Sequence, residues 1–201
     1  MTDRDRRSGS SRQPVRTDGG ATEGPRVEDP EAELLAAGAL EEASSGDLQV
    51  TSTFNEAWQA EIQDVKADED ANRQELVDVM GIDSDGEVEL EAVNDAFRIT
   101  IDGALIGSLE SEAAFYADLA AARLLEDRLQ AWHELPVADR SRLLKGLRLF
   151  LEICPECGTE VVFDTKTVES CCGSYQVAAV DCDGCGSRLF ESAPIDEDAM
   201  D

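Results

Sequence analysis

Apolar side chains recur every three or four residues in five stretches of the chain, the spacing that places them on one face of a helix. At the start of the second stretch, Thr53 and Glu56 form a capping-box pattern, and we expect this helix to bury Trp58. Gly81 is suited to end the third helix, and Ser111 can cap the fourth. The predicted helices cover residues 31–40, 53–65, 69–80, 111–129 and 137–153.

Between residues 87 and 108 the apolar period changes from about 3.6 to 2, which predicts strands in place of helices. Residues 88–92 alternate apolar and acidic side chains, and residues 97–101 place Phe97, Ile99 and Ile101 on one face. Asp102 and Gly103 follow as a strong signal for a type I′ hairpin turn. The pattern therefore predicts a meander of three antiparallel strands, with one more short strand at residues 47–50.

Acidic residues dominate the surface chemistry of this chain. Among 201 residues, 45 are Asp or Glu and 17 are Lys or Arg, which gives a formal net charge of -28. So much like charge opposes compaction at ordinary ionic strength, whereas at about 1 M salt the Debye length falls to roughly 3 Å. The composition resembles that of cytoplasmic proteins from extreme halophiles, which implies a salt-adapted cytoplasmic protein. An acidic partner-binding protein from an ordinary cell is the alternative.

The charge distribution also limits the partners. Residues 27–201 contain no basic stripe of the kind that displaces counterions from phosphate, so direct binding to a nucleic acid duplex is disfavoured. Residues 1–30 are poor in large apolar side chains, and we expect a disordered arm there whose arginines could contact an anionic partner. Arg6 and Arg7 precede no apolar run that would make an export signal. No apolar stretch approaches the roughly 18 residues of a membrane span.

All six cysteines lie between residues 154 and 185, and four of them form two matching pairs. Cys154 and Cys157 are followed by Gly158, and the same spacing returns at Cys182 and Cys185 before Gly186. Such a turn points two thiolates at one spot, and its glycine supplies the positive φ that the turn requires. Paired Cys-x-x-Cys spacing in a reducing compartment favours a metal over disulfides. We therefore expect Cys154, Cys157, Cys182 and Cys185 to hold one structural Zn²⁺ ion.

These two knuckles resemble those of the zinc-ribbon family, a rubredoxin-like fold with the metal at the head of a β-hairpin or a three-stranded sheet. The resemblance covers about the last fifth of the chain and implies a fold and a metal, but no activity. Iron remains an alternative metal, because four thiolates also form a rubredoxin site. Thioredoxin-type chemistry is disfavoured, because it needs one such pair at the start of a helix.

Cys171 and Cys172 depart from the simple ribbon pattern. Neighbouring side chains on a strand point to opposite faces, so at most one of the two can turn toward the metal or the core. One of them could be a replacement ligand or a redox-sensitive thiol, although a packed thiol beside an idle one is the simpler interpretation. His133 is the only histidine, and without a nucleophile motif we expect it to be a surface residue.

Together the patterns predict an α+β fold, in which helices pack one face of a small antiparallel β-meander, followed by a C-terminal zinc ribbon. The expected organisation is a disordered arm over residues 1–30, an α+β domain over 31–152, the ribbon over 153–193 and an acidic tail over 194–201. We expect a non-enzymatic interaction or regulatory module for a protein partner. The alternatives are an accessory nucleic-acid-binding or transcription-related protein, and a thiol redox protein that uses Cys171 or Cys172.

Overall fold

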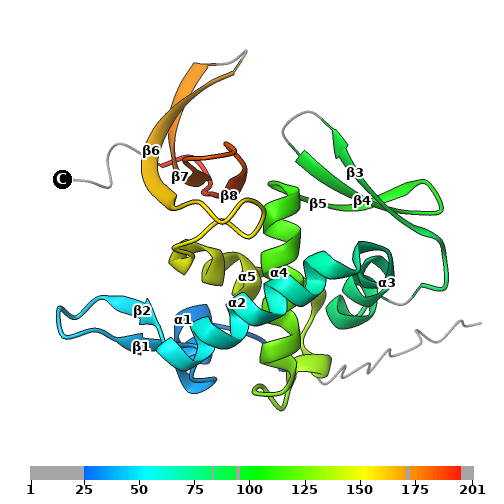
Figure 1. The fold of residues 1–201 in the computed structure, drawn as a ribbon, viewed down its shortest axis with the longest axis horizontal. Coiled ribbons are helices and arrows are strands. Elements are labelled where there is room, and N and C mark those ends of the chain that lie inside the picture. Colours follow the sequence, from blue (N-terminus) through cyan, green and yellow to red (C-terminus); the bar gives the residue numbers. More distant parts are fainter. Residues whose placement is uncertain (1–24, 83, 94–95, 171–172, 196–201) are drawn as a thin grey trace, which may run out of the picture.

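The computed structural model describes residues 25–82, 84–93, 96–170 and 173–195. They form an α+β fold with three separate antiparallel sheets, as the hydrophobic pattern predicts (Figure 1). None of the helices in these ranges is both long and apolar enough to cross a membrane. The elements, including two 3₁₀ turns η1 and η2, are α1 Pro30–Ala36, β1 Leu40–Glu42, β2 Leu48–Val50, α2 Ser52–Ala67, α3 Glu69–Met80, β3 Val88–Val93, β4 Ala96–Ile101, β5 Ala104–Leu109, α4 Glu112–Glu126, η1 Trp132–Glu134, α5 Val137–Leu147, η2 Arg148–Phe150, β6 Val161–Ser170, β7 Gly173–Cys182 and β8 Arg188–Glu191.

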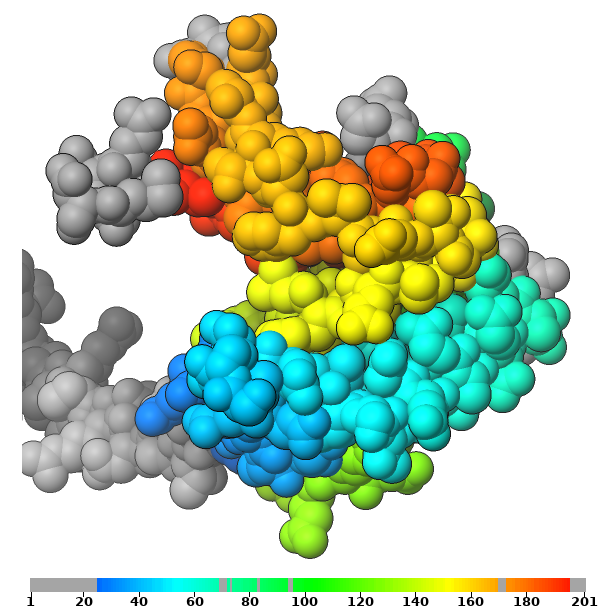
Figure 2. All heavy atoms as spheres, turned by 60° about the vertical axis from the view of Figure 1, so that its left-hand side comes forward, coloured from blue at the N-terminus to red at the C-terminus, as the bar shows by residue number. Residues whose placement is uncertain are grey.

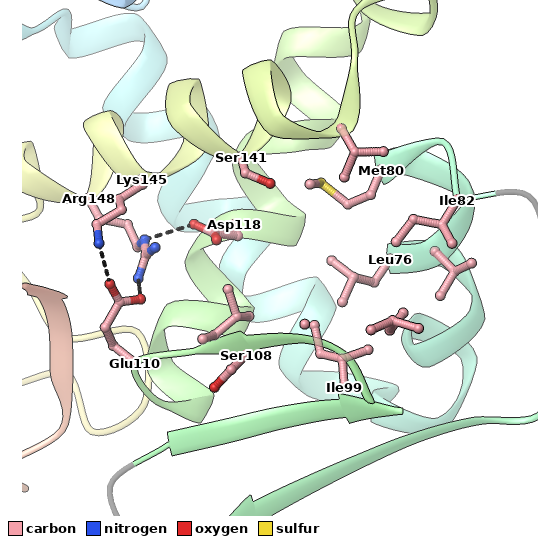
Figure 3. A pocket seen from close by; sticks show the side chains of 15 residues that line it. Leu76, Met80, Ile82, Ile99, Ser108, Glu110, Asp118, Ser141, Lys145 and Arg148 are labelled. Atoms are coloured by element: carbon pink, nitrogen blue, oxygen red, sulfur yellow. Dashed lines mark hydrogen bonds and ion pairs between the residues drawn. The ribbon is translucent and has the colours of Figure 1, made fainter. Parts of the chain in front are cut away.

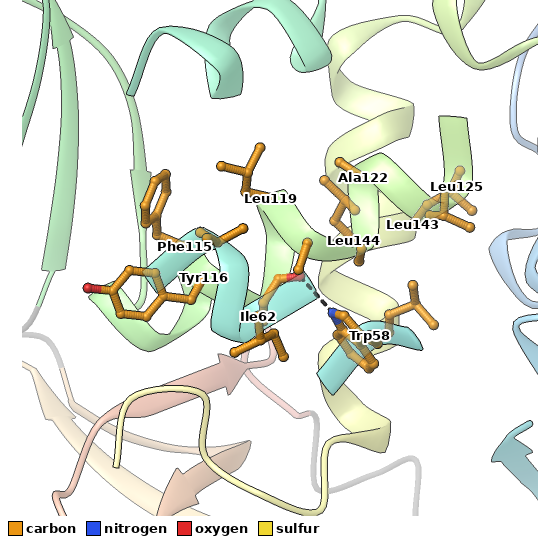
Figure 4. Packing of buried hydrophobic residues seen from close by; sticks show 14 of the residues in the cluster. Trp58, Ile62, Phe115, Tyr116, Leu119, Ala122, Leu125, Leu143 and Leu144 are labelled. Carbon is orange, nitrogen blue, oxygen red and sulfur yellow. Dashed lines mark hydrogen bonds between the residues drawn. The ribbon is translucent and has the colours of Figure 1, made fainter. Parts of the chain in front are cut away.

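Helix α4 is the centre of the structure. It is buried on nearly every face and contacts α2, α3 and α5, and its many alanines allow these helices to approach closely. Figure 4 shows this packing, in which Trp58 of α2 donates a hydrogen bond from Nε1 to the Ala117 carbonyl at 2.9 Å. The predicted burial of Trp58 is confirmed, and its indole N–H is satisfied inside the core.

The predicted meander is confirmed as the sheet β3-β4-β5. Phe97, Ile99 and Ile101 of β4 are all buried, because every second side chain of this strand points at the helices. Asp102 and Gly103 both have positive φ, 50° and 76°, as a type I′ turn requires. The meander packs against α3 and α4 through this face.

Two helix boundaries differ from the predictions. Helix α2 is capped by Thr51, whose hydroxyl accepts from the Phe54 amide at 3.2 Å, so the predicted Thr53 cap is wrong. Thr51 prevails because its hydroxyl also donates to the Gly38 carbonyl at 2.9 Å. Helix α1 ends at Ala36, short of the predicted residue 40, because Gly38 adopts a φ of 66° and turns the chain into the unpredicted strand β1.

The two ends of the helical region also differ from the sequence pattern. Val27, which lies in the predicted arm, is buried at 4% exposure, and its amide donates to Asp139 of α5. The packed structure therefore begins before residue 31, and residues 1–24 lie outside the described residues. Helix α5 ends at Leu147, and the predicted continuation to residue 153 is the single 3₁₀ turn η2 followed by extended chain.

Residues 25–152, here called the body, are followed by residues 153–195, here called the ribbon. The ribbon is the sheet β6-β7-β8, in which the long β6–β7 hairpin stands away from the body (Figure 1). Strand β8 contacts α4 and η2 and so joins the ribbon to the body. Figure 2 shows the orange and red strands of the ribbon on one side of residues drawn in yellow, and the blue and cyan part of the body on the other side. A pocket within the body is lined by β2, the start of α2 and residues 149–152.

Candidate metal centre

The four predicted cysteine ligands converge on one point. The sulfur atoms of Cys154, Cys157, Cys182 and Cys185 all lie within 4.8 Å of one another. The Sγ atoms of Cys154 and Cys185 are 3.8 Å apart, and those of Cys157 and Cys182 are 3.3 Å apart. The two knuckles, separated by the whole β6–β7 hairpin, are thus brought together by the pairing of these strands.

The two knuckles have matching backbone geometry. The Gly158 amide donates to the Cys154 carbonyl at 2.9 Å, and the Gly186 amide donates to the Cys182 carbonyl at 3.0 Å. Gly158 and Gly186 have φ values of 76° and 78°, which confirms the predicted need for glycine after each pair. Residues with a Cβ adopt this conformation only with strain, so the glycines hold each turn tight around its two sulfurs.

Backbone amides also point at the buried sulfur of each knuckle. The amides of Gly184 and Cys185 donate to Cys182 Sγ at 3.3 and 3.4 Å, and those of Glu156 and Cys157 donate to Cys154. Hydrogen bonds of this kind stabilise negative charge on sulfur. The backbone around these two sulfurs therefore stabilises thiolates, which are the form of cysteine that binds metal.

The donor set fits one tetrahedral metal ion. Four sulfurs at about 2.3 Å from a zinc ion form a tetrahedron with edges of about 3.8 Å. Two of the sulfur pairs are 3.3 and 3.8 Å apart, and every pair lies within 4.8 Å. Cys154 and Cys182 are 1% and 3% exposed, whereas Cys157 and Cys185 lie at the surface. The ion would therefore be shielded on the body side and close to solvent on the other.

The thiols differ in how easily they ionise. Burial raises the pKa of Cys154 far above its ordinary value, and burial also raises the pKa of Cys185. Cys157 is exposed, and hydrogen bonds from Thr159 and Cys182 lower its pKa to about 6. A divalent cation at the centre would favour the thiolate form of all of them, because its positive charge lies next to every sulfur.

A second layer of contacts ties the first knuckle to the body. Lys66 of α2 donates from Nζ to the Glu156 carbonyl at 2.7 Å. The Glu156 carboxylate accepts from the Ser187 hydroxyl, which lies 3.3 Å from Cys185 Sγ. Both knuckles and helix α2 are thereby linked, so the position of the cluster depends on the body as well as on the ribbon.

A buried arginine joins the ribbon to the body and was not singled out by the sequence pattern. Arg148 of η2 is 2% exposed and donates from Nη1 to Glu110 at 2.6 Å and to the Leu189 carbonyl of β8 at 2.5 Å. Its Nε lies 3.0 Å from Asp118 Oδ1. Burial lowers the pKa of Arg148, but the charges of Asp118 and Glu110 outweigh this effect, and the net pKa is raised. The guanidinium therefore stays charged at the junction.

Other residues singled out from the sequence do not join this centre. His133 is exposed, and its Nε2 lies 2.7 Å from Glu126, in agreement with the predicted surface position. Cys171 and Cys172 lie outside the described residues, so a ligand or redox role for either stays a prediction. Among the residues that the structure describes, the four-cysteine group is the one cluster of potential metal ligands.

Comparison with known proteins identifies the same two regions. The central-domain model of a family of unknown function (DUF8054) matches residues 29–149. The C-terminal-domain model of that family matches residues 152–192, which include all four cysteines of the cluster. No curated protein and no solved structure matches the chain.

Proposed function

Since this chain belongs to the DUF8054 family, whose function is unknown, we propose a function from the geometry of the chain itself. We propose that it is a non-enzymatic zinc protein whose ribbon docks onto a protein partner. Cys154, Cys157, Cys182 and Cys185 hold the zinc ion. The ion fixes the root of the β6–β7 hairpin, and the hairpin presents the binding surface. The convergence of four sulfurs at the base of a projecting hairpin is the observation that carries this proposal.

The surroundings of the cluster favour zinc over iron. A rubredoxin-type iron site is usually shielded by aromatic side chains. Here Phe163 is 62% exposed and so does not shield the cluster, and two of the four sulfurs lie at the surface. Zinc does not change its oxidation state in proteins, so a zinc site needs no shielding from solvent. Elemental analysis of the purified protein tests this point: one zinc per chain supports it, and the visible absorption of an iron–thiolate site overturns it.

The outer strand of the hairpin provides the docking surface. Strand β6 is an edge of its sheet, so its outer backbone groups are not paired with another strand of the described structure. The neighbouring side chains of Val162 and Phe163 point to opposite faces, and they are 47% and 62% exposed. An edge strand with apolar side chains on both faces is a template for an added strand. The partner would supply an extended segment with apolar side chains, and basic neighbours would complement the acidic chain.

Capture of the partner by paired variants tests this surface. The full zinc-loaded chain, its Phe163→Ser variant and its Thr165→Ser variant serve as baits in molar salt, with chemical cross-linking. Thr165 follows on the same face of β6 and is exposed, so it is the matched control. We expect one protein to cross-link to β6 in the wild type and the control, and to be lost with Phe163→Ser. Retention by Phe163→Ser would contradict docking through this strand.

We further propose that the protein works in concentrated salt. The net charge of -28 is spread along the chain, while several of its few basic side chains are committed to ion pairs, among them Arg123, Arg148 and Arg188. The excess carboxylates repel one another, and salt at about 1 M reduces the range of that repulsion to roughly 3 Å. The free energy of unfolding should therefore rise steadily with KCl concentration. A flat or falling dependence would contradict salt adaptation.

A further inference from the structure

A cavity of about 220 Å³ lies between the meander and the helices of the body, away from the metal centre. Strands β4 and β5 form its floor, and helices α3, α4 and α5 form its walls (Figure 3). One end of the cavity is apolar, and the other collects charged and hydroxyl groups. Cavities that combine these two halves are typical of sites for small amphiphilic molecules.

The apolar end is lined by Leu76 and Met80 from α3, together with Ile82 and Ile99 (Figure 3). Leu76 and Ile99 are buried, and Met80 adapts its shape readily because its side chain is unbranched. A purely apolar cavity of about 150 Å³ holds benzene. The volume at this site therefore suits a ligand of roughly eight to ten non-hydrogen atoms.

The polar end is charge-balanced. Lys145 and Arg148 face Glu110 and Asp118, with Lys145 Nζ 2.9 Å and Arg148 Nη1 2.6 Å from the two Glu110 oxygens. Two cations and two carboxylates leave no net charge for a charged ligand to neutralise. A charged head group would thus be buried without a counterpart, which is costly.

Hydrogen-bonding capacity nevertheless remains at this end. The carboxyl group of Asp118 lines this end of the cavity and is 5% exposed, and its Oδ1 forms an ion pair with Arg148 Nε at 3.0 Å. Ser141 of α5 adds a hydroxyl group beside the cavity (Figure 3), whereas the Ser108 side chain lies opposite exposed Arg98 on the outer face of the meander. The polar end can therefore both donate to a ligand and accept from it.

We propose that this cavity binds a small amphiphile with a short aliphatic body and an uncharged head, of the amide or alcohol class, that both donates and accepts hydrogen bonds. The aliphatic body lies among Leu76, Met80 and Ile99. The head lies between Asp118 and the hydroxyl group of Ser141. This site lies outside the metal centre, and the proposal does not depend on the docking function proposed for the ribbon.

A series of probes with one chain length and different heads tests the chemistry. Hexanamide, 1-hexanol, hexylamine and hexanoate are titrated into the full zinc-loaded chain, and binding is followed by amide NMR shifts. We expect hexanamide and 1-hexanol to shift the amides of Gly107, Ser108 and Asp118, and the two charged probes to bind at least about tenfold more weakly. Tighter binding of either charged probe, or no binding of any, would overturn the proposal.

Cavity-filling variants test the place. A Cβ added at Gly107 would meet only the Ile99 side chain, at 3.9 Å, so Gly107→Leu should fold and occupy the cavity. Ala104→Leu is the matched control, because Ala104 is an exposed residue of the same strand and does not line the cavity. Hexanamide binding should be lost in the first variant and kept in the second. Ser141→Leu, on the exposed rim in α5, replaces Gly107→Leu if that variant does not fold. Unchanged binding in a folded filled variant would overturn the proposal.

Discussion

In the body, helix α4 is surrounded by α2, α3 and α5 and buries side chains on every face, whereas the ribbon buries few apolar side chains of its own. Among the described residues of the ribbon, those that are buried are, apart from one proline, Cys154, Val177, Ala179, Val180, Cys182 and Leu189, and two of these six are cysteines of the cluster. A core this small does not offset the entropy of ordering two long strands. We therefore expect that burial is enough to fold the body, whereas the ribbon needs a metal ion at its four cysteines.

The contacts within the body differ from those between the body and the ribbon. Within the body, elements contact one another through apolar side chains. The junction with the ribbon adds a buried charge, because Arg148 bonds to Glu110 of the body and to the Leu189 carbonyl of the ribbon. Such a contact has directional requirements that apolar packing lacks. It therefore fixes how the ribbon is placed on the body.

The largest effect is expected from removing a metal ligand. Cys182→Ser should abolish stoichiometric metal binding and unfold the ribbon, because structural zinc sites contribute apparent binding energies of about 10 to 16 kcal/mol. The body should keep its helices, which circular dichroism measures beside elemental analysis. Ser174→Ala, at an exposed position of β7 outside the cluster, is the control and should retain its metal. A Cys182→Ser protein with a full complement of metal would break the comparison.

A disruptive substitution in the core of the body should leave metal binding by the ribbon unchanged. Trp58→Ala should lower the free energy of unfolding of the body by about 4 kcal/mol, since it empties a large buried volume and leaves the Ala117 carbonyl without its donor. Trp58→Phe should cost clearly less. Urea titration measures both variants, and metal content should stay at one per chain while the protein is folded. A loss for Trp58→Ala below that of Trp58→Phe would contradict this account of the core.

Removing the junction arginine should have a smaller and pH-dependent effect. Arg148→Met should cost about 3 kcal/mol at neutral pH, because it leaves Asp118 buried without its cation and Glu110 with Lys145 alone. Burial raises the pKa of Asp118 to about 6, so this carboxyl gains a proton below that pH and no longer needs the cation. Because the charge of Arg148 lowers the pKa of Asp118, this pKa is higher in the variant than in the wild type, and the loss should shrink as the pH falls toward about 6. A loss that is independent of pH between 5 and 8 would rule out Asp118 as the group left unpaired.

The smallest expected effect is the difference in stability between two substitutions of threonine at the start of α2. Thr51→Ala should cost about 1 kcal/mol, because the hydroxyl that caps α2 is lost, whereas Thr53→Ala should change stability by less than about 0.5 kcal/mol. Thermal unfolding of the two variants side by side measures the difference. Equal losses would mean that Thr51 does not cap the helix.

Features set by local spacing could be predicted from the sequence. The alternation in residues 88–101 identifies the meander, and the two cysteine pairs identify the cluster, because a repeat of two and a Cys-x-x-Cys-Gly turn depend only on neighbours in the chain. The cap of α2 could not be chosen in the same way. Thr53 fits the capping-box pattern, but Thr51 gains a second hydrogen bond from the approach of Gly38, which is a tertiary contact.

Features that need distant residues were missed. Nothing in the local sequence pairs Arg148 with Glu110, Asp118 and Leu189, because only the folded chain brings η2, α4 and β8 together. Val27 was assigned to a disordered arm for the same reason, since a single apolar residue in a polar segment gives no periodic signal. The cavity beside the meander likewise exists only once α3, α5 and β5 are packed.

Hydrogen exchange before and after metal removal tests most directly the claim that the metal, and not a core, holds the ribbon. The full chain is treated with a strong chelator in molar salt, and amide exchange is followed in both regions. The account predicts that the amides of β6 and β7 lose their protection while those of α2 and α4 keep theirs. A ribbon that stays protected without metal, or a body that unfolds together with it, would contradict the account.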